Sequence, residues 1–405
     1  MTASRFLAPP TAPSFAAHRP TALLHAYRPR ADRFFASPTR TLLARGVRHA
    51  VPHGSQPLSE RVRATLDRAR SPATPVPVVV GAIPFDLAAP CALVVPRALH
   101  WAPALASDPL IGQSGRSPVQ GRYRLRPHPA PHEYAARVSA AVGRLRSGEL
   151  DKVVLSRVLD VVGVQEIRLP GVLRRLAGRD PAGYLFAVPS GRDRTLVGAS
   201  PELLVARRGR HLTTTLLAGS RPRGRTPAED ARHSKALRSS DKDRHEHAIL
   251  VDAVLAALAP QCAQLHAPST PTLLHTATMW HLATPLTGIL ATDGTTALDL
   301  ACRLHPTPAV CGTPVHAARQ LLQELEPFDR GMYAGLVGWQ DAYGDGEWAL
   351  TIRCAEVAQH TARLFAGAGI VADSCAQEET AETEAKFATL LHALGAGLPA
   401  AAGAV

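Results

Sequence analysis

The sequence predicts an α+β fold with antiparallel strands, on the basis of two patterns. Groups of short, β-branched apolar segments alternate with long segments of helical period, which is typical of α+β proteins rather than of a Rossmann fold. Tight turns separate neighbouring strand segments, which favours hairpins. The chain has 405 residues, of which 46% are hydrophobic, so it can bury one large core or two ordinary ones.

The first half of the chain contains two clear strands and a helix. Val78–Ile83 is an unbroken apolar run between two prolines, as in a buried strand. Glu133–Leu145 has helical spacing, and Lys152–Val161 is rich in β-branched residues. Lys152 begins this strand, where a lysine is more often a surface residue whose stem packs while its ammonium stays in water.

A hairpin and two helices follow. Leu203–Ala206 and His211–Leu217 flank a short turn that contains arginine and glycine, which predicts a hairpin. Thr226 can cap a helix whose first residue is proline, and Glu229 completes the capping box. The helical pattern breaks near Ser239 and then continues with one apolar face.

The C-terminal part predicts three strands and a long helix. Tyr333–Gln340, Glu347–Val357 and Ala362–Val371 are strand-like, and turn residues separate them, which indicates an antiparallel meander. Gln377–Leu394 carries an apolar stripe at helical spacing, so it is the last predicted helix.

The basic charge is concentrated near the N-terminus. The formal net charge is +12, and residues 1–131 carry 17 basic and 5 acidic side chains, whereas residues 132–405 are neutral overall. The excess is scattered among proline and alanine without a base-reading motif, so we expect no nucleic-acid partner. We expect residues 1–33 to be a flexible basic extension, because their prolines disfavour the amphipathic helix of a transit peptide. Residues 34–398 should form one domain, and residues 399–405 a flexible tail.

Cysteine usage and hydropathy limit the class of protein further. The six cysteines lie far apart without a C-x-x-C pair, which argues against a disulfide framework or a structural zinc site. This pattern fits the reducing cytoplasm. No run of 18 or more apolar residues occurs, so we expect no membrane-spanning segment.

Lysine is rare in this chain. Only Lys152, Lys235, Lys242 and Lys386 occur, so 41 of the 45 basic residues are arginine. A lysine kept where arginine is the usual basic residue suggests a chemical requirement, because lysine can lose its proton and act as a base, whereas arginine effectively cannot.

The last predicted helix places Glu379, Glu382 and Lys386 on one face. The ordinary interpretation is a solvated face with a Glu382–Lys386 pair at i, i+4. Two carboxylates three residues apart can also hold a hard cation such as Mg²⁺, which prefers oxygen ligands. The spacing alone leaves both interpretations open.

Two further glutamates stand in settings with two interpretations. Glu246 borders the apolar face of its helix, so it is either paired or a ligand. The surrounding segment does not match the zinc-protease pattern H-E-x-x-H, because residue 249 is isoleucine. Glu202 follows a turn between two strands, where a glutamate is more often structural.

Two C-terminal segments can bind an anionic ligand. Gly367 and Gly369 lie inside a strand pattern, where glycine permits a ligand to approach the backbone closely. Arg353 faces away from its neighbours Ile352 and Cys354, and its guanidinium can bind a carboxylate with two parallel bonds.

In combination, these segments resemble the chorismate-utilising enzymes, and within them the isochorismate synthases of the 2,3-dihydroxybenzoate siderophore type. The resemblance covers roughly residues 34–394 and implies the fold of anthranilate synthase component I, with large antiparallel sheets in the core and helices outside. It rests on ten ordered motifs: VGAIPFD at 80–86, KVVLSR at 152–157, GASPE at 198–202, LAGS at 217–220, DRHEH at 243–247, WHLATP at 280–285, HPTPA at 305–309, ELEPFDR at 324–330, TIRC at 351–354 and GAGIV at 367–371.

The resemblance implies a Mg²⁺-dependent isomerase that converts chorismate to isochorismate. Lys152 is implied as the general base that activates water, which requires a lowered pKa of its amine. Glu202 is implied as the general acid that protonates the departing 4-hydroxyl, which requires a raised pKa. His281 would orient the substrate near the reacting carbons.

The remaining roles are also carried over by similarity. Mg²⁺ would be held by Glu246, Glu379 and Glu382, with Glu378 a neighbouring alternative to Glu379 because a tryptophan usual in the family is missing there. The residues implied in substrate binding are Gly219, Ala309, Arg353, Gly367 and Lys386, of which Lys386 also tunes the carboxylates.

Two alternatives remain at this point, a salicylate synthase and a catalytically silent binding subunit. Salicylate synthases are similar but usually carry threonine at the place of Ala309, so alanine favours an enzyme that stops at isochorismate. Anthranilate-type synthases lack a lysine at the place of Lys152. A catalytically silent binding subunit is disfavoured because the acid, the base and the metal carboxylates are all present. Members of this type are usually monomers.

Overall fold

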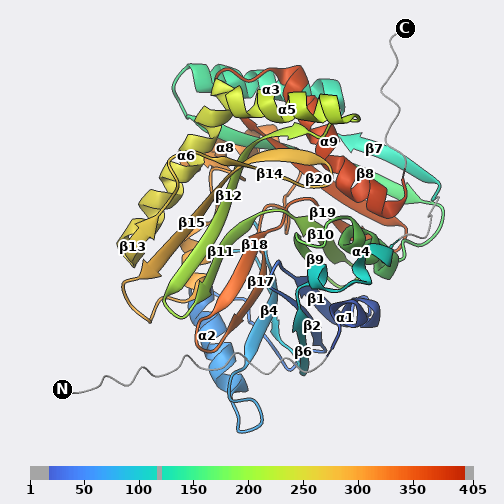
Figure 1. The fold of residues 1–405 in the computed structure, drawn as a ribbon, viewed down its shortest axis with the longest axis vertical. Helices are drawn as coiled ribbons and strands as arrows, with labels where there is room; N and C mark the ends of the chain where they lie inside the picture. Colours follow the sequence, from blue (N-terminus) through green and yellow to red (C-terminus); the bar gives the residue numbers. More distant parts are fainter. Residues whose placement is uncertain (1–17, 116–120, 397–405) are drawn as a thin grey trace.

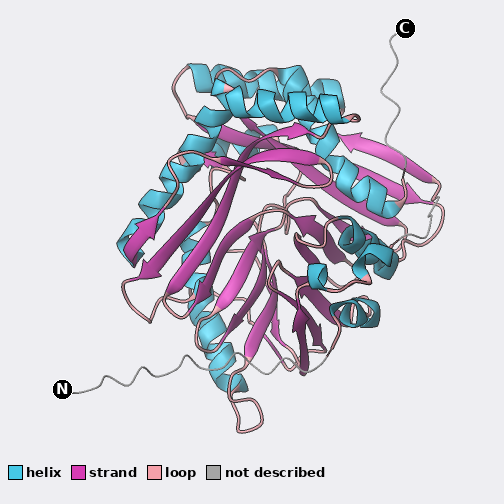
Figure 2. Cartoon of the chain, in the orientation of Figure 1, coloured by secondary structure: helices cyan, strands magenta, loops and turns pink. Residues whose placement is uncertain are grey.

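The structure, a computed structural model, describes residues 18–115 and 121–396. Two large antiparallel sheets of ten strands each form its centre, and the helices lie around them (Figures 1 and 2). The α+β class and the antiparallel pairing are therefore confirmed. None of the helices in the described ranges is long and apolar enough to cross a membrane.

The first sheet, sheet A, has the strand order β16-β8-β20-β19-β10-β9-β1-β2-β6, with β7 paired to β8. Its strands are β1 (Asp32–Ala36), β2 (Arg40–Arg45), β6 (Ala98–Pro103), β7 (Tyr123–His128), β8 (Lys152–Gly163), β9 (Tyr184–Pro189), β10 (Thr195–Ser200), β16 (Gly312–Thr313), β19 (Cys354–Ala358) and β20 (Thr361–Ile370).

The second sheet, sheet B, has the order β13-β15-β12-β11-β18-β17-β4-β5-β3, with β14 paired to β15. Its strands are β3 (His49–Ala50), β4 (Val78–Ile83), β5 (Ala92–Val95), β11 (Leu203–Arg208), β12 (His211–Pro222), β13 (Cys262–His266), β14 (Thr272–His275), β15 (Met279–Leu290), β17 (Leu336–Asp341) and β18 (Gly346–Leu350).

The helices cover the outer surfaces of the sheets. Figure 1 shows α3, α5 and α9 together at the top, α6 along the left, α2 at the bottom and α1 with α4 at the right. Their bounds are α1 (Pro20–Ala26), α2 (Leu58–Ala69), α3 (Pro131–Arg146), α4 (Leu169–Arg179), α5 (Pro227–Ser239), α6 (Asp241–Leu258), α7 (Ala297–Leu304), α8 (Val315–Leu325) and α9 (Ala376–Leu394).

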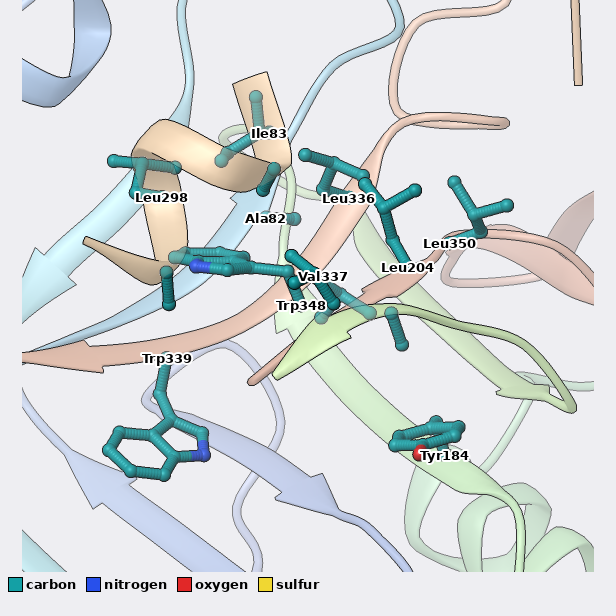
Figure 3. Close-up of a cluster of buried hydrophobic side chains, with 14 of the residues drawn as sticks. Ala82, Ile83, Tyr184, Leu204, Leu298, Leu336, Val337, Trp339, Trp348 and Leu350 are labelled. Atoms are coloured by element: carbon teal, nitrogen blue, oxygen red, sulfur yellow. The ribbon is translucent and has the colours of Figure 1, made fainter. Parts of the chain in front are cut away.

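The largest apolar cluster combines side chains of both sheets. Phe186 and Leu196 of sheet A belong to the same buried cluster as Val337 and Trp348 of sheet B. Figure 3 shows Trp348 beside Val337, with Leu298 of α7 on the same side of the cluster. The two sheets are thus held together by apolar side chains from neighbouring strands, as in other packed-sheet cores.

The chain changes sheet several times, and two of these crossings lie side by side. Between β10 and β11 it leaves sheet A, and between β18 and β19 it returns. Two backbone hydrogen bonds join these crossings: the Leu350 N–H donates to Glu202 O at 3.1 Å, and the Ala199 N–H donates to Arg353 O at 3.2 Å. Glu202 and Arg353 are therefore fixed next to each other, although 151 residues separate them.

Several predicted elements agree with the structure. Val78–Ile83 is β4 with the same bounds, and the predicted hairpin is the antiparallel pair β11–β12. The predicted break near Ser239 separates α5 from α6, where the Ser240 hydroxyl accepts a hydrogen bond from the Asp243 N–H. Capping residues therefore give a local signal that the tertiary structure retains.

The single predicted strand Glu347–Val357 is wrong. The segment contains β18 and β19, which belong to different sheets, and Arg353 between them has a φ of 49°. Apolar alternation continues across the break, so the period gives no sign of the change of sheet. The predicted meander is accordingly two hairpins, β17–β18 in sheet B and β19–β20 in sheet A.

The N-terminal segment also differs from the prediction where it is described. Residues 18–33, placed in a flexible extension, include helix α1 and the start of β1. Leu23 and Leu24 are buried in a cluster with α4, α9 and sheet A, and the Thr21 hydroxyl donates to the Asp108 carboxylate at 2.6 Å. Burial of two leucines explains the order despite the flanking prolines. Residues 1–17 and the predicted tail 399–405 lie outside the described residues.

Candidate active site

The two crossings place Glu202 against a set of cationic side chains. Glu202 is buried, and one of its carboxylate oxygens accepts a long 3.5 Å hydrogen bond from the Leu217 N–H. Burial raises the pKa of Glu202 to about 8, although the charges of Lys152, Lys386 and Arg353 act in the opposite direction. The group is thus a carboxylic acid at neutral pH and can donate a proton.

Lys152 begins β8 and is buried completely, so the surface interpretation of this lysine is wrong. Its Nζ lies 2.9 Å from Glu246 Oε1 on α6, which is ion-pair distance, although the angle does not make a hydrogen bond. A Cβ added to Gly369 on β20 would overlap Glu246 Oε1 and lie 3.1 Å from Lys152 Cε. The glycine therefore makes room for this pair.

Each predicted metal carboxylate is paired with a lysine. Glu246 pairs with Lys152, Glu382 with Lys386 at 2.5 Å, and Glu379 with Lys242 of α6 in a very short contact. Three of the four lysines of the chain are used in this way. The solvated-face interpretation of α9 is wrong for Glu379, which is buried at this end of the helix.

The two glutamates of α9 interact strongly with each other. Burial and the neighbouring charge of Glu382 raise the pKa of Glu379. Burial also acts to raise the pKa of Glu382, but Lys386 and Lys242 hold it below its ordinary value. The Ser220 hydroxyl of β12 donates to Glu382 at 2.9 Å. Two neighbouring carboxylates, one buried and one half-buried, are stabilised by a cation, so their donor chemistry fits Mg²⁺.

The described residues nevertheless contain no set of three histidine, cysteine, aspartate or glutamate side chains gathered closely enough to share one ion. In this conformation the positive charge beside Glu246, Glu379 and Glu382 comes from the lysine ammonium groups. The carboxylates are of the right kind for Mg²⁺, and in this conformation each of them is paired with a lysine.

Arg353 and His281 are two further buried residues of the cluster. Arg353 is buried, which lowers its pKa to about 10, so it stays charged at neutral pH beside Glu382, Tyr333 and Glu202. Burial, together with Arg353 and Lys386, lowers the pKa of His281 well below its ordinary value. His281 is therefore a neutral imidazole, and its Nε2 has no hydrogen-bond partner within the described part of the chain.

At two glycines, Gly367 and Gly219, the backbone packs closely against side chains of the cluster or its edge. A Cβ at Gly367 on β20 would lie 2.7 Å from the Ser156 hydroxyl and 2.9 Å from the Tyr333 hydroxyl. The Gly367 carbonyl accepts a 2.7 Å hydrogen bond from Lys386 Nζ. Gly219, with a φ of 76°, produces a bulge in β12 beside Asp243. These positions need glycine for space and for backbone conformation, respectively.

The structure thus brings ten of the eleven predicted site residues into or directly beside one cluster, in which Glu382 and Lys386 are half-buried and the others are buried. Ala309 is the exception: it is half-buried against the apolar core, and its N–H donates to the Thr307 hydroxyl at 3.3 Å. No hydrogen bond or ion pair in the described ranges joins Ala309 to the cluster. Its predicted role in choosing between products stays a prediction.

Sequence reasoning missed three residues of the cluster. Lys242 of α6 and Ser220 of β12 contact predicted site residues. The Tyr333 hydroxyl, in the turn before β17, lies close to Gly367 and shares a hydrogen bond with Ser156. The rarity of lysine was a usable signal for Lys242, since Lys235 alone of the four lysines is exposed and outside the cluster. Tyr333 and Ser220 had no comparable signal, because their contacts join segments far apart in the chain.

Comparison with known proteins identifies relatives that match most of this chain. The chain is 46% identical over 384 residues to isochorismate synthase DhbC of Bacillus subtilis (92% of this chain, 96% of that protein). It is 41% identical over 366 residues to the vibriobactin-specific isochorismate synthase of Vibrio cholerae (89% and 91%).

Solved structures agree in fold. The structure of a putative 2,3-dihydroxybenzoate-specific isochorismate synthase, DhbC from Bacillus anthracis, matches with a TM-score of 0.87 and 44% identity (93% of this chain, 100% of that chain). Anthranilate synthase component I from Streptococcus pneumoniae, 22% identical, shares the fold with a TM-score of 0.65 (90% of each chain). Residues 113–395 match the sequence profile of a family described as chorismate binding enzyme, and the chain belongs to this family.

Proposed function

We propose that the protein is an isochorismate synthase that isomerises chorismate to isochorismate, for 2,3-dihydroxybenzoate siderophore biosynthesis. One observation carries the proposal: a fully buried lysine and a carboxylic acid with a pKa of about 8 interact within the same buried cluster, next to a buried arginine. A reaction that adds water at one ring carbon and removes hydroxide from another needs such a base and such an acid.

In this mechanism Lys152, as the neutral amine, takes a proton from a water molecule as its oxygen bonds to C2 of the ring. The double bonds shift, the C4–O bond breaks, and Glu202 gives its proton to the departing oxygen, so that one water enters and one leaves. The Arg353 guanidinium pairs with the enolpyruvyl carboxylate, together with the backbone at Gly367. The neutral His281 ring, whose buried Nε2 has no hydrogen-bond partner among the described residues, orients the substrate.

Mg²⁺ would be held by Glu246, Glu379 and Glu382, whose carboxylate oxygens are the kind of ligand that this ion prefers. When bound, it would neutralise the second substrate carboxylate and help to orient the ring. Burial and the neighbouring charge of Glu382 raise the pKa of Glu379, and a bound cation would offset both effects, which supports this assignment. We further propose that the enzyme is a monomer that works in the cytoplasm, where its six free cysteines would remain reduced.

The test is to incubate purified protein with chorismate and Mg²⁺ and to separate the products by chromatography. We expect isochorismate without pyruvate, and its loss in Lys152→Ala and with a chelator. Lys235→Ala, which changes the exposed lysine, is the matched control and should be fully active. Salicylate with stoichiometric pyruvate would instead identify a salicylate synthase. No consumption of chorismate would contradict the proposal and favour a silent homologue.

A further inference from the structure

Lys242 is a charged residue of the cluster to which the proposed chemistry assigns no role. It lies in the first turn of α6 and reaches across to Glu379 of α9, 137 residues away in the chain. The Glu379 side chain is 1% exposed, whereas that of Lys242 is 22% exposed. The pair therefore joins a buried carboxylate to an ammonium group that lies at the edge of the cluster.

The three lysine–carboxylate pairs differ in how firmly each lysine is held. Lys152 is enclosed completely by neighbouring side chains and backbone, so it has no room to turn toward the surface. Lys386 donates to the Gly367 carbonyl as well as to Glu382, so its position is fixed twice. Lys242 donates only to Glu379 among the described residues, and it can turn toward solvent without leaving a buried donor unpaired.

On this basis we propose that Lys242 is a positioning residue that holds Glu379 in the metal-free protein and yields this carboxylate to Mg²⁺. The inference rests on the proposed function, because it takes Glu379 to be a metal ligand. Lys242 supplies a positive charge that a buried carboxylate requires until a divalent cation supplies it instead. Mg²⁺ and the Lys242 ammonium then compete for the same carboxylate.

The choice of lysine supports this role in a chain that otherwise uses arginine. A guanidinium binds a carboxylate through a rigid two-bond fork, whereas a lysine ammonium sits on a flexible stem and is strongly hydrated. A residue that must release its partner is better served by lysine. Lysine at this position gives a carboxylate that is ordered without the metal but still available to it.

The test measures metal binding and stability without chorismate, so that it does not depend on turnover. Lys242→Gln is compared with wild type and with Lys235→Gln, the same change at the exposed lysine of α5. Titration calorimetry with MgCl₂ gives the Kd, and thermal unfolding is followed with and without saturating Mg²⁺. Lys242→Arg, which keeps the charge, should restore the melting temperature of the metal-free protein.

We expect Lys242→Gln to bind Mg²⁺ about fivefold more tightly or better, since coupling between two sites is typically worth a factor of about 5 to 150. Its melting temperature should fall without Mg²⁺ and recover with Mg²⁺. Equal losses of melting temperature in both conditions, with an unchanged or weaker Mg²⁺ affinity, would mean that Lys242 is only structural. Wild-type protein that takes up no Mg²⁺ would overturn both this inference and the metal site, while leaving isochorismate formation to be judged by the product assay.

Discussion

Burial decides the protonation state of the acidic and basic groups in the candidate site. Glu202 keeps its proton at neutral pH because its carboxylate would be desolvated, while His281 loses its proton for the same reason. The two groups therefore reverse their usual states: the carboxyl is a donor and the imidazole is uncharged. This reversal provides an acid for the leaving hydroxyl without adding negative charge near a dianionic substrate.

The pKa of Glu202 predicts a pH dependence of catalysis. Because the acid must be protonated, kcat/KM should fall as the pH rises through the pKa of about 8. Glu202→Gln should lose roughly 10²- to 10⁴-fold in kcat, and the decline near pH 8 should disappear from its residual activity. The measurement is a pH–rate profile for both proteins, and the same decline in the variant would assign it to another group.

The same pKa has a consequence for stability. A carboxyl with a raised folded-state pKa binds a proton in the native protein but not in the unfolded chain between about pH 4.3 and 8, so native stability decreases as pH rises through this range. Urea unfolding at several pH values should show that Glu202→Gln gains stability relative to wild type over this window. A difference that does not vary with pH would contradict the raised pKa.

Glu378 and Glu379 are neighbours in the first turn of α9, but their side chains lie in different environments. Glu378 is exposed, whereas Glu379 is buried beside Lys242 and Glu382. We expect Glu379→Gln to weaken Mg²⁺ binding by roughly tenfold or more, because even changes around metal ligands cost about 10- to 100-fold. Glu378→Gln is the matched control and should bind Mg²⁺ like wild type in calorimetry. The reverse result would move the metal site to Glu378.

The backbone of β20 lies directly against site side chains at Gly369, so a substitution at this glycine should disturb them. A methyl group there would overlap Glu246 and press on Lys152, so Gly369→Ala should displace the pair and reduce kcat/KM by roughly 100-fold. Gly143→Ala in α3 is the control, since nothing lies within 4 Å of its added Cβ, and it should stabilise the helix by about 0.5–1 kcal/mol. Steady-state kinetics with thermal unfolding separates the two effects; unchanged kinetics in Gly369→Ala would show that the pair can move freely.

Elements with local signals were predictable from the sequence, and contacts between distant segments were not. β4 and the break between α5 and α6 follow from apolar runs and capping residues, which act over a few positions. The alternation of apolar residues with a period of two continues through the change of sheet near Arg353, so it does not predict this change. The ion pair between Lys242 and Glu379 joins α6 to α9 and depends on how the two helices pack. The motifs indicated which residues matter, but burial and partners came from the structure.

Helices α1 and α9 and both sheets contribute to the large apolar clusters, which bears on how the whole molecule unfolds. α1 and α9 are buried in one cluster with sheet A, and the largest cluster contains strands of both sheets. Between them, these clusters connect elements from Leu23 to Leu394. A single cooperative domain is therefore the prediction, although chains of this length often unfold in steps.

Unfolding in urea should accordingly give one transition by two probes. Tryptophan fluorescence follows the sheets, where Trp101, Trp339 and Trp348 lie, and far-UV circular dichroism follows the helices as well. Leu24→Ala in α1 removes a side chain that is 1% exposed, so it should lower the unfolding free energy by about 2–5 kcal/mol and move both transitions equally. Val164→Ala, at a valine that is 76% exposed, should change neither. If Leu24→Ala moves only one probe, the N-terminal part unfolds separately and the single domain is wrong. Coincident shifts would instead mean that a helix far from the catalytic residues stabilises the strands that hold Glu202 and Lys152.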